Sequence, residues 1–289
     1  MKAFKKDKCP GPDGWSIDIF IHFFDIMKND ILGMVEEIRT QGRIHPNISS
    51  TYIVLIPKRK ASSTFADYRP ISLCNVIYKI TSKIIVERIR GKLPEHISKE
   101  QHGFLCGRNI LEAVAITQEA MHSIHSKNIE AAILRIDFKR AYDCLDWSFL
   151  RCLLIKIGLN DRCTKGIMSC VEGVNYAILI NGPPTPFFLV GRGLRQGCSL
   201  SPILFILVMD SLSLHIKKVV NDGKLAPLSS PEVIFILIIS FWMMCCCLLD
   251  FAGSPSILCM KLFCYFKEPL VSISMKANPL FTMARMHME

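Results

Sequence analysis

The sequence has no Cys-x-x-Cys pair and no cysteine–histidine spacing typical of zinc ligands, although 13 of its 289 residues are cysteine. It also shows no signal peptide. These absences argue against a zinc module and against a secreted, disulfide-bonded domain. Cysteines such as Cys74, Cys144 and Cys170 have apolar neighbours, which predicts reduced, buried thiols in an intracellular protein.

Acidic residues are too few to balance the basic ones, and the formal net charge is +10. Residues 1–232 contain 31 of the 35 Lys and Arg and 22 of the 25 Asp and Glu, so nearly all of the excess lies there. Such a surplus indicates an anionic partner, either nucleic acid or a membrane surface. The length is enough for one large domain or two.

Charge is missing altogether between Val233 and Leu249, where the only hydroxyl group is that of Ser240. This run lies near the lower end of the roughly 17–25 residues that cross a bilayer as a helix. A membrane protein that spans residues 233–249 is therefore one alternative for this chain.

The first part of the chain begins with a turn and a helical pattern. Gly11-Pro-Asp-Gly14 predicts a turn, and Ser16 is placed to cap the helix that follows. Tyr52–Ile56 predicts a short strand that ends at Pro57. The apolar residues that recur at helical spacing after the turn are Phe20, Phe23, Phe24, Met27, Ile31 and Val35.

A second helix is expected over Val76–Lys92. Its outward face would carry Lys79, Lys83 and Arg90, which suits either contact with phosphates or a plain solvated surface. The residues expected to face inward are Ile77, Ile80, Ile84 and Ile85.

The second half predicts a strand over Ala131–Ile136 that places Asp137 at its end. Asp146 can cap the next helix, which stops at Gly158. The core stripe of that helix would be Phe149, Leu153, Leu154 and Ile157. Two strands then flank an Asn-Gly turn, and Ser201-Pro202 begins a helix whose apolar body predicts burial. The strands are expected over Tyr176–Ile180 and Phe187–Val190.

Two blocks carry the chemistry: Leu134-Arg-Ile-Asp-Phe-Lys-Arg-Ala-Tyr-Asp143 and Gly193-Leu-Arg-Gln-Gly-Cys-Ser-Leu-Ser-Pro202. Nucleotidyl transfer uses carboxylates that hold two divalent metals about 3.5–4 Å apart. Asp137, at a strand end, could bridge two such metals but could not neutralise them alone. Taken by itself, an aspartate at such a junction is more often a cap or a surface residue.

With further motifs in the same order, these blocks resemble the reverse transcriptase of non-LTR (LINE-like) retrotransposons over residues 10–225. Lys58 in Ile-Pro-Lys and Arg69 in Ala-Asp-Tyr-Arg-Pro-Ile-Ser-Leu match the fingers motifs of that family. The resemblance implies that both cations hold the triphosphate of the incoming nucleotide, which suits the planar fork of arginine.

The resemblance also implies a metal ligand and a gate. Asp137 would be the first ligand of the Mg²⁺ cofactor, and the backbone carbonyl of Phe138 would be a second. Tyr142, after Ala141, matches the gate position, where an aromatic ring leaves no room for a ribose 2′-hydroxyl.

Two further segments match motifs that contact nucleic acid or nucleotide. Gln196-Gly197 matches the loop that packs under the new base pair. The segment Gln101-His-Gly-Phe-Leu-Cys-Gly-Arg108 is similar to the template-contacting segment, in which a glycine lets the backbone approach nucleic acid. The candidate template contacts in that segment are Gln101, Gly103, Phe104 and Arg108.

The paired aspartates of the family are missing, because no Asp-Asp dipeptide occurs in the chain. Phe241-Trp-Met-Met-Cys-Cys-Cys247 stands in their place. Trp and Met have single codons, so this segment is encoded by TTY TGG ATG ATG TGY TGY TGY. If reading starts one nucleotide before the Trp codon, the same bases give YTG GAT GAT GTG YTG YTG. These codons encode Leu-Asp-Asp-Val-Leu-Leu. The missing box is therefore encoded out of frame, with Met243 and Met244 where the aspartates belong. Ser272–Phe281 resembles the family again, which implies that the frame is regained there.

We therefore expect an α+β right-hand polymerase fold that is incomplete and lacks a full thumb. Residues 1–130 would form the fingers, 131–232 the palm, and 233–289 a degenerate palm region and tail. The resemblance implies RNA-directed DNA polymerisation from an RNA template, a DNA primer and deoxynucleoside triphosphates by two-metal transfer. Without the Asp-Asp box, we expect this chain to be inactive. The first alternative is a nucleic-acid-binding remnant, and the second is the membrane protein that spans 233–249.

Overall fold

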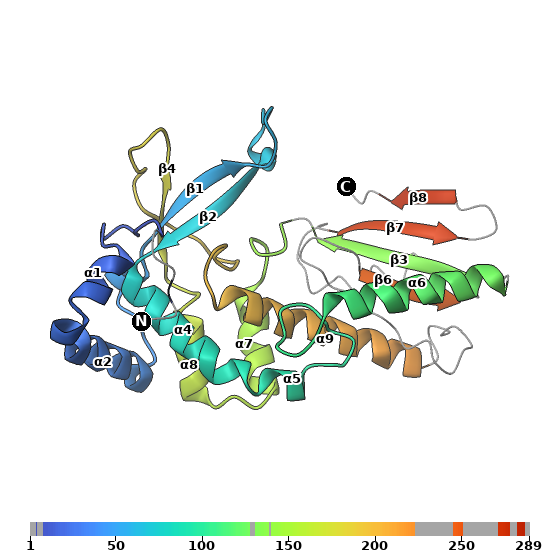
Figure 1. The fold of residues 1–289 in the computed structure, drawn as a ribbon, viewed down its shortest axis with the longest axis horizontal. Helices are drawn as coiled ribbons and strands as arrows, with labels where there is room; N and C mark the ends of the chain where they lie inside the picture. The colour runs from blue at the N-terminus through green and yellow to red at the C-terminus, as the bar shows by residue number, and fades with distance from the viewer. Residues whose placement is uncertain are drawn as a thin grey trace. The chain divides into compact units, whose positions relative to one another are not determined.

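The computed structural model describes residues 4, 8–127, 131–138, 140–222, 245–250, 271–277 and 282–286. Residues 131–138 and the strands beyond residue 222 are described by their backbone. The chain forms two compact units, each built from two stretches of sequence (Figure 1). Unit 1 combines Met1–Ile89 with Tyr142–Ile203, and unit 2 combines Arg90–Ala141 with Leu204–Glu289. The expected α+β class is confirmed, because helices and a sheet occur in both units.

Unit 1 contains a four-stranded sheet in the order β2-β1-β4-β5. β1 pairs antiparallel with β2 and parallel with β4, and the strand expected at Tyr52–Ile56 is thereby confirmed. The strands are β1 (Thr51–Pro57), β2 (Tyr68–Cys74), β4 (Asn175–Leu179) and β5 (Phe188–Leu189). The helices are α1 (Ile17–His22), α2 (Phe24–Gln41), α3 (Pro46–Ser49), the 3₁₀ turn η1 (Phe65–Asp67), α4 (Val76–Arg90), α7 (Trp147–Lys156) and α8 (Asp161–Ser169).

Unit 2 contains a second sheet in the order β6-β3-β7-β8, in which every neighbouring pair is antiparallel. The strand predicted to deliver Asp137 is confirmed as β3 (Ala131–Phe138). The remaining strands are β6 (Cys245–Asp250), β7 (Val271–Ala277) and β8 (Thr282–Met286). The helices are α5 (Leu93–His96), α6 (Ile110–Ser126) and α9 (Ser201–Asn221), which begins at the end of unit 1.

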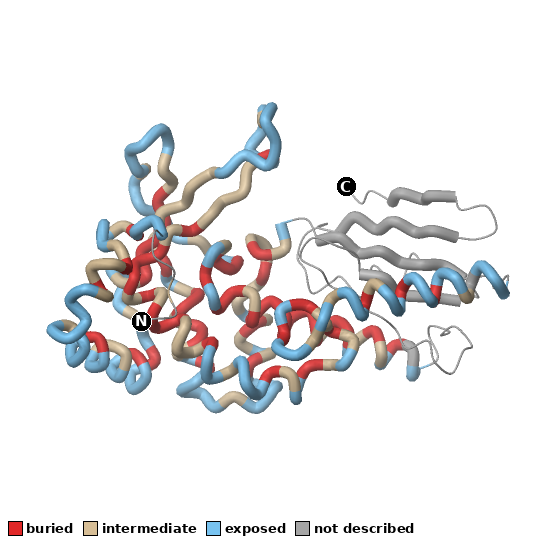
Figure 2. Tube along the Cα trace, in the orientation of Figure 1, coloured by how far each residue is buried: buried red, intermediate tan, exposed pale blue. Residues whose placement is uncertain are grey.

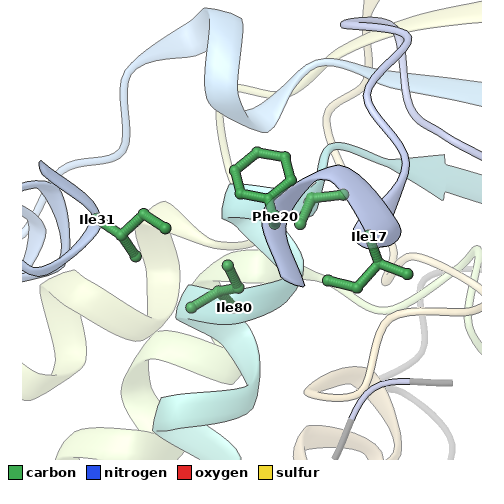
Figure 3. Packing of buried hydrophobic residues seen from close by; sticks show 5 residues of the cluster. Ile17, Phe20, Ile31 and Ile80 are labelled. Carbon is green, nitrogen blue, oxygen red and sulfur yellow. The ribbon is translucent and has the colours of Figure 1, made fainter. Parts of the chain in front are cut away.

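A small apolar core joins the N-terminal helices of unit 1 to α4. Ile17 and Phe20 from α1, Ile31 from α2 and Ile80 from α4 are all buried in one cluster (Figure 3). Each such side chain contributes about 1.5–3 kcal/mol to stability on burial. The cluster explains why α1 lies on α4 although the two are far apart in the sequence.

The predicted N-terminal helix is interrupted, which corrects part of the sequence pattern. Phe23 is the C-cap of α1 and the N-cap of α2 and does not have helical backbone angles. The predicted apolar pattern is therefore divided between two helices. Phe23 and Phe24 are consequently 46% and 38% exposed instead of buried. Gly14 N donates to Gly11 O at 3.1 Å, which confirms the turn. Ser16 occupies the N-cap position, but its side chain makes no capping hydrogen bond.

α4 ends at Arg90, two residues earlier than predicted. Its inward side includes Ile80, as expected, but Ile77, Ile84 and Ile85 are only half-buried. On the expected outward basic face, Lys79 is half-buried, and its Nζ donates to Cys9 O at 3.1 Å. A second contact of this face also involves the N-terminal segment, since Lys83 Nζ lies 4.8 Å from the centroid of the Phe4 ring.

The second half of the chain contains the helices predicted after Asp146 and from Ser201, together with α8, which was not predicted. Asp146 caps α7, because its Oδ1 accepts a hydrogen bond from Phe149 N at 3.0 Å. The buried residues of α7 are Leu150 and Leu154, whereas Ile157 is 48% exposed and was wrongly placed in the core stripe. The apolar first half of α9 is buried, as predicted (Figure 2).

The apolar run considered as a membrane span, Val233–Leu249, lies outside the described residues except for Cys245–Leu249. Those residues belong to strand β6. In the part of the chain that the structure describes, no helix has both the length and the apolar character needed to cross a membrane.

Candidate nucleotide-binding site

β1 and β2 form a hairpin (Figure 1). Of the two cations expected to hold a triphosphate, Arg69 lies in β2 and Lys58 directly follows β1. Arg69 in β2 is paired with Ile56 in β1, and Lys58 N donates to Asp67 O at 2.8 Å just beyond the end of the ladder. Residues two apart on a strand share a face, so this register puts Lys58 and Arg69 on the same side of the hairpin. Lys58 is exposed and Arg69 half-buried. The backbone pairing thus places the two predicted cations on one side of the same hairpin.

The tip of this hairpin is held by Asp67. Its carboxylate accepts hydrogen bonds from Arg59 and from the backbone and hydroxyl of Thr64, at 3.2 and 2.9 Å for the latter two. Arg59, followed by Thr64, lowers the pKa of Asp67 to about 2. Lys58 Nζ donates to Ala66 O at 2.7 Å, so its ammonium group also contributes to the order of the tip.

The loop at residues 193–197 is bonded to the segment that follows Tyr142. Gly193 N donates to Leu145 O at 2.8 Å, and Leu194 N donates to Tyr142 O at 2.7 Å. Trp147 Nε1 adds a bond to Gly193 O at 2.8 Å. Gly193 has a φ of +95°, and a Cβ there would lie 2.8 Å from Asp143 O. Only glycine allows this close approach.

Gln196 connects that loop to both the hairpin and the segment after Tyr142. Its backbone carbonyl accepts a hydrogen bond from Ser72 N in β2 at 2.7 Å. Its side-chain Nε2 donates to Asp143 Oδ1 at 2.9 Å. Gly197 follows with a φ of +104°, and a Cβ there would lie 3.3 Å from Ser72 O. The predicted Gln196-Gly197 loop therefore lies against the same strand that carries Arg69.

Tyr142, the predicted gate residue, is 6% exposed. Burial, with a smaller contribution from Cys198, raises the pKa of its hydroxyl above the ordinary value. Its carbonyl is the acceptor for Leu194 N, so the residue is bound to the Gln196 loop through its backbone. Ala141, which precedes it, is half-buried and is the last residue of its stretch of unit 2.

The sequence motifs did not single out Arg195, which is 4% exposed. Its guanidinium donates to Ser49 O and Thr51 Oγ1, both at 3.2 Å, and to Cys170 O at 3.1 Å. Burial raises the pKa of the nearby Cys170 thiol to about 12, so that thiol is neutral at pH 7. The one available signal was that Arg195 is the single charged residue of the block Gly193–Pro202, because such a cation must find acceptors if it is buried.

In unit 2, the backbone of Asp137 is paired with Ser272 of β7, and that of Ile136 with Cys245 of β6. Asp137 thus lies near the end of the strand, as predicted, although the strand continues through Phe138, beyond the predicted range Ala131–Ile136. Met243 and Met244, the positions of the displaced aspartates, lie outside the described residues. They directly precede Cys245 in the sequence, whose strand partner is the residue next to Asp137.

The predicted template-contacting segment lies in unit 2 and is bonded to the residues that precede it. Arg108 donates to the carbonyls of Ser98, Gln101, Pro94 and Ile97, at 2.7–2.9 Å for the last three. Gln101 and Gly103 are buried, and Phe104 is 58% exposed with a left-handed φ of 59°. Of the four candidates, Phe104 is the one with a large exposed side chain.

The loop that precedes this segment is attached to α9. Asp210 Oδ1 accepts a hydrogen bond from Ser98 N at 3.0 Å, and Lys217 Nζ donates to Glu100 Oε2 at 2.8 Å. Burial is the largest influence on Asp210 and raises its pKa. These contacts fix the loop relative to α9 within unit 2.

Among the described side chains, no group of three or more His, Cys, Asp or Glu residues could hold a metal ion. None of the eight cysteines whose side chains are described forms a disulfide bond.

Comparison with known proteins explains the motifs. Residues 56–236, more than half of the chain, match the family model for "Reverse transcriptase (RNA-dependent DNA polymerase)". An uncharacterised 149 kDa protein of transposon TX1 from Xenopus laevis is 26% identical over 218 residues, which cover 75% of this chain and 17% of that protein. The Pol polyprotein of retrotransposable element R2DM from Drosophila melanogaster is 26% identical over 203 residues, covering 70% and 19%.

Among solved structures, telomerase from Candida tropicalis, in complex with a TWJ fragment of telomeric RNA, aligns with a TM-score of 0.47 and 12% identity. That alignment covers 78% of this chain and 40% of the telomerase chain. This chain spans less than a fifth of the length of the two transposon relatives. The match over residues 56–236 decides the assignment: the chain belongs to the reverse transcriptase (RNA-dependent DNA polymerase) family.

Proposed function

We propose that this chain is the fingers and palm of a non-LTR retrotransposon reverse transcriptase that binds nucleic acid and nucleotide but does not catalyse DNA synthesis. One observation carries the binding half of the proposal. β2 contains Arg69, and Ser72 of the same strand donates a backbone hydrogen bond to the carbonyl of Gln196 in the Gln196-Gly197 loop. Residues from separate motifs therefore meet on one strand, as a nucleotide-binding site requires.

The roles follow the chemistry of each side chain. Lys58 and Arg69 would bind the triphosphate, because arginine pairs with phosphate oxygens through a planar fork. Gln196 and Gly197 would support the new base pair, and Tyr142 would exclude a ribose 2′-hydroxyl. Phe104 is suited to stack on an unpaired template base, since it is 58% exposed. The partners would be an RNA template, a DNA primer and deoxynucleoside triphosphates.

The donor atoms of this sequence do not fit a site for two Mg²⁺ ions. Mg²⁺ prefers carboxylate, carbonyl and water oxygens. The chain offers Asp137 and the carbonyl of Phe138, but thioether side chains stand at Met243 and Met244. One carboxylate cannot balance two dications, so we expect a loss of rate on the order of 10³-fold or more.

Primer extension tests the catalytic half of the proposal. The chain is incubated with an RNA template, a DNA primer, all four deoxynucleoside triphosphates and Mg²⁺. We expect no extension above a control without protein. Extension that disappears in Asp137→Ala would show that the site is complete in some other way and would overturn the proposed inactivity.

The alternative of a plain nucleic-acid-binding remnant is favoured by the net charge, because residues 1–232 carry almost all of the basic excess. Both functions predict salt-dependent binding of primer–template: the logarithm of the affinity should fall linearly as the logarithm of the salt concentration rises. They differ in nucleotide binding. A complex that the matching deoxynucleoside triphosphate stabilises, and that loses this response in Arg69→Ala, supports the reverse transcriptase site. Salt-dependent binding without any nucleotide response supports the remnant.

A further inference from the structure

We propose that Asp143 is a positioning residue that turns the side-chain amide of Gln196 so that its carbonyl oxygen faces the bound nucleotide. The proposal rests on the function proposed above, in which Gln196 contacts the nucleotide. It adds the direction in which Gln196 offers its hydrogen bond and therefore the kind of ligand atom that it accepts.

The orientation follows from what each group can do. The Nε2 atom of Gln196 lies 2.9 Å from Asp143 Oδ1. A carboxylate only accepts hydrogen bonds, whereas an amide has a donating and an accepting end. The donating end must therefore face Asp143. Turning the amide over would place two acceptor oxygens against each other, which is unfavourable.

The backbones that carry both partners are held in place independently. Asp143 lies beside Tyr142, whose carbonyl accepts from Leu194 N at 2.7 Å. Gln196 is fixed through its own carbonyl by Ser72 N at 2.7 Å. Gly193 packs so closely on Asp143 O that a Cβ would lie 2.8 Å away. The side-chain bond therefore needs little further ordering of the chain, and it leaves Oε1 at the far end of the amide.

An accepting oxygen selects the part of a nucleotide that it can bind. It pairs with a sugar hydroxyl or a base amino group, both of which donate. It repels the oxygens of a triphosphate, which only accept. Gln196 is half-buried and Gly197 is exposed, so ligand atoms can reach this end of the loop. The structure thus separates two tasks: Lys58 and Arg69 suit the triphosphate, while Gln196 suits the nucleoside.

Reversing the polarity of the bond tests the proposal. The variants are Gln196→Glu, Asp143→Asn and the two combined, with Asp161→Asn as a matched control on the exposed start of α8. The probe is dTTP, added to the chain with an RNA template and DNA primer whose next template base is adenine. Affinity for dTTP is measured through its stabilisation of this complex.

Gln196→Glu should weaken dTTP binding by about tenfold or more, because two carboxylates then face each other. Asp143→Asn alone should weaken it by about two- to fivefold, because asparagine accepts either orientation of the amide. The double variant should return to within about threefold of the original chain, since the introduced asparagine amide donates to the introduced glutamate carboxylate and an accepting oxygen again faces outward. A double variant as weak as the two single effects combined would overturn the proposal, and Asp161→Asn should bind as the original chain does.

A second measurement does not depend on nucleotide. Nuclear magnetic resonance of the Gln196 side-chain amide reports exchange of its hydrogens with water. Exchange should become at least about fivefold faster in Asp143→Ala and remain unchanged in Asp161→Ala. Unchanged exchange in Asp143→Ala would disprove the bond itself. If dTTP has no effect on the original chain, the proposed nucleotide binding fails, while the exchange rates still decide whether Asp143 orients Gln196.

Discussion

The guanidinium of Arg195 lies over the ring of Tyr78, with its central carbon 3.8 Å from the ring centroid. Tyr78 is almost fully buried, and its hydroxyl donates to Cys170 O at 3.0 Å, an oxygen that Arg195 also uses. The pair joins α4, the end of α8 and the loop that carries Gln196. Arg195 is thus a buried cation whose charge is spread over a ring face and neutral acceptors.

Replacing this cation should destabilise unit 1. Arg195→Met removes the hydrogen bonds that Arg195 donates to Ser49 O and Thr51 Oγ1. It also removes the contact between the guanidinium and the Tyr78 ring. We expect a loss of about 2–4 kcal/mol in the free energy of unfolding. Urea denaturation measures it. Arg162→Met, at an exposed position of α8, is the matched control and should change stability by less than about 0.5 kcal/mol. Equal effects of both substitutions would contradict the buried role of Arg195.

Gly193 offers a second test with a matched glycine two residues away. Gly193→Ala places a methyl group 2.8 Å from Asp143 O at a φ of +95°. We expect a loss of about 1–3 kcal/mol, because both the left-handed backbone and the contact are unfavourable. A Cβ at Gly191 would meet nothing within 4 Å, and Gly191 has no positive φ. Gly191→Ala should therefore have nearly the stability of the original chain. Thermal unfolding compares the two, and a similar fall in Tm for both would contradict the close packing at Gly193.

The acid response of the hairpin tip follows from Asp67. Its pKa is lowered from 3.8 to about 2, chiefly by Arg59. A lowered pKa means that the folded state favours the carboxylate. The contribution of the Asp67 carboxylate to folding stability is therefore complete above about pH 4 and is lost as the pH falls through about 2. The stability difference between the original chain and Asp67→Asn should shrink over that interval. The Asp67 carboxyl carbon, followed by nuclear magnetic resonance, should titrate near 2, and Arg59→Met should move the midpoint upward. An unmoved midpoint would show that Arg59 is not the cause.

Local rules in the sequence predicted much of what positions the site. The strand before Lys58, the cap at Asp146 and the turn before α1 depend on neighbouring residues, and all three are confirmed. Side chains whose partners are distant in the sequence were less predictable. Lys79 was expected on an outward face, and its hydrogen bond to Cys9 O, 70 residues away, was not predicted. Helical periodicity does not predict such a long-range contact.

The same limit applies within the motifs. Arg108 was expected to contact the template, yet its guanidinium donates to four backbone carbonyls, two in the preceding loop and two at α5 and its C-cap. Its contact with a template stays a prediction. Gln196 and Gly197 were chosen by family resemblance, whereas their attachment to Ser72 and Asp143 follows from how three separate segments meet. A motif identifies such residues, but only packing shows which atoms they offer.

The missing aspartates lead to a prediction about metal affinity. Changing Met243 and Met244 together to aspartate restores the two carboxylates that the alternative reading frame encodes next to Cys245. Cys245 is the strand partner of Ile136, the residue before Asp137, so the new carboxylates should join Asp137. Adding them should raise affinity for a hard, oxygen-seeking dication by about tenfold or more. Calorimetric titration with Mn²⁺ measures the change. Asp137→Ala in the altered chain should remove most of the gain, and Met121→Asp, on the partly exposed side of α6, should produce none. A gain that does not depend on Asp137 would place the new carboxylates elsewhere and would disconnect the displaced box from the strand-end acid.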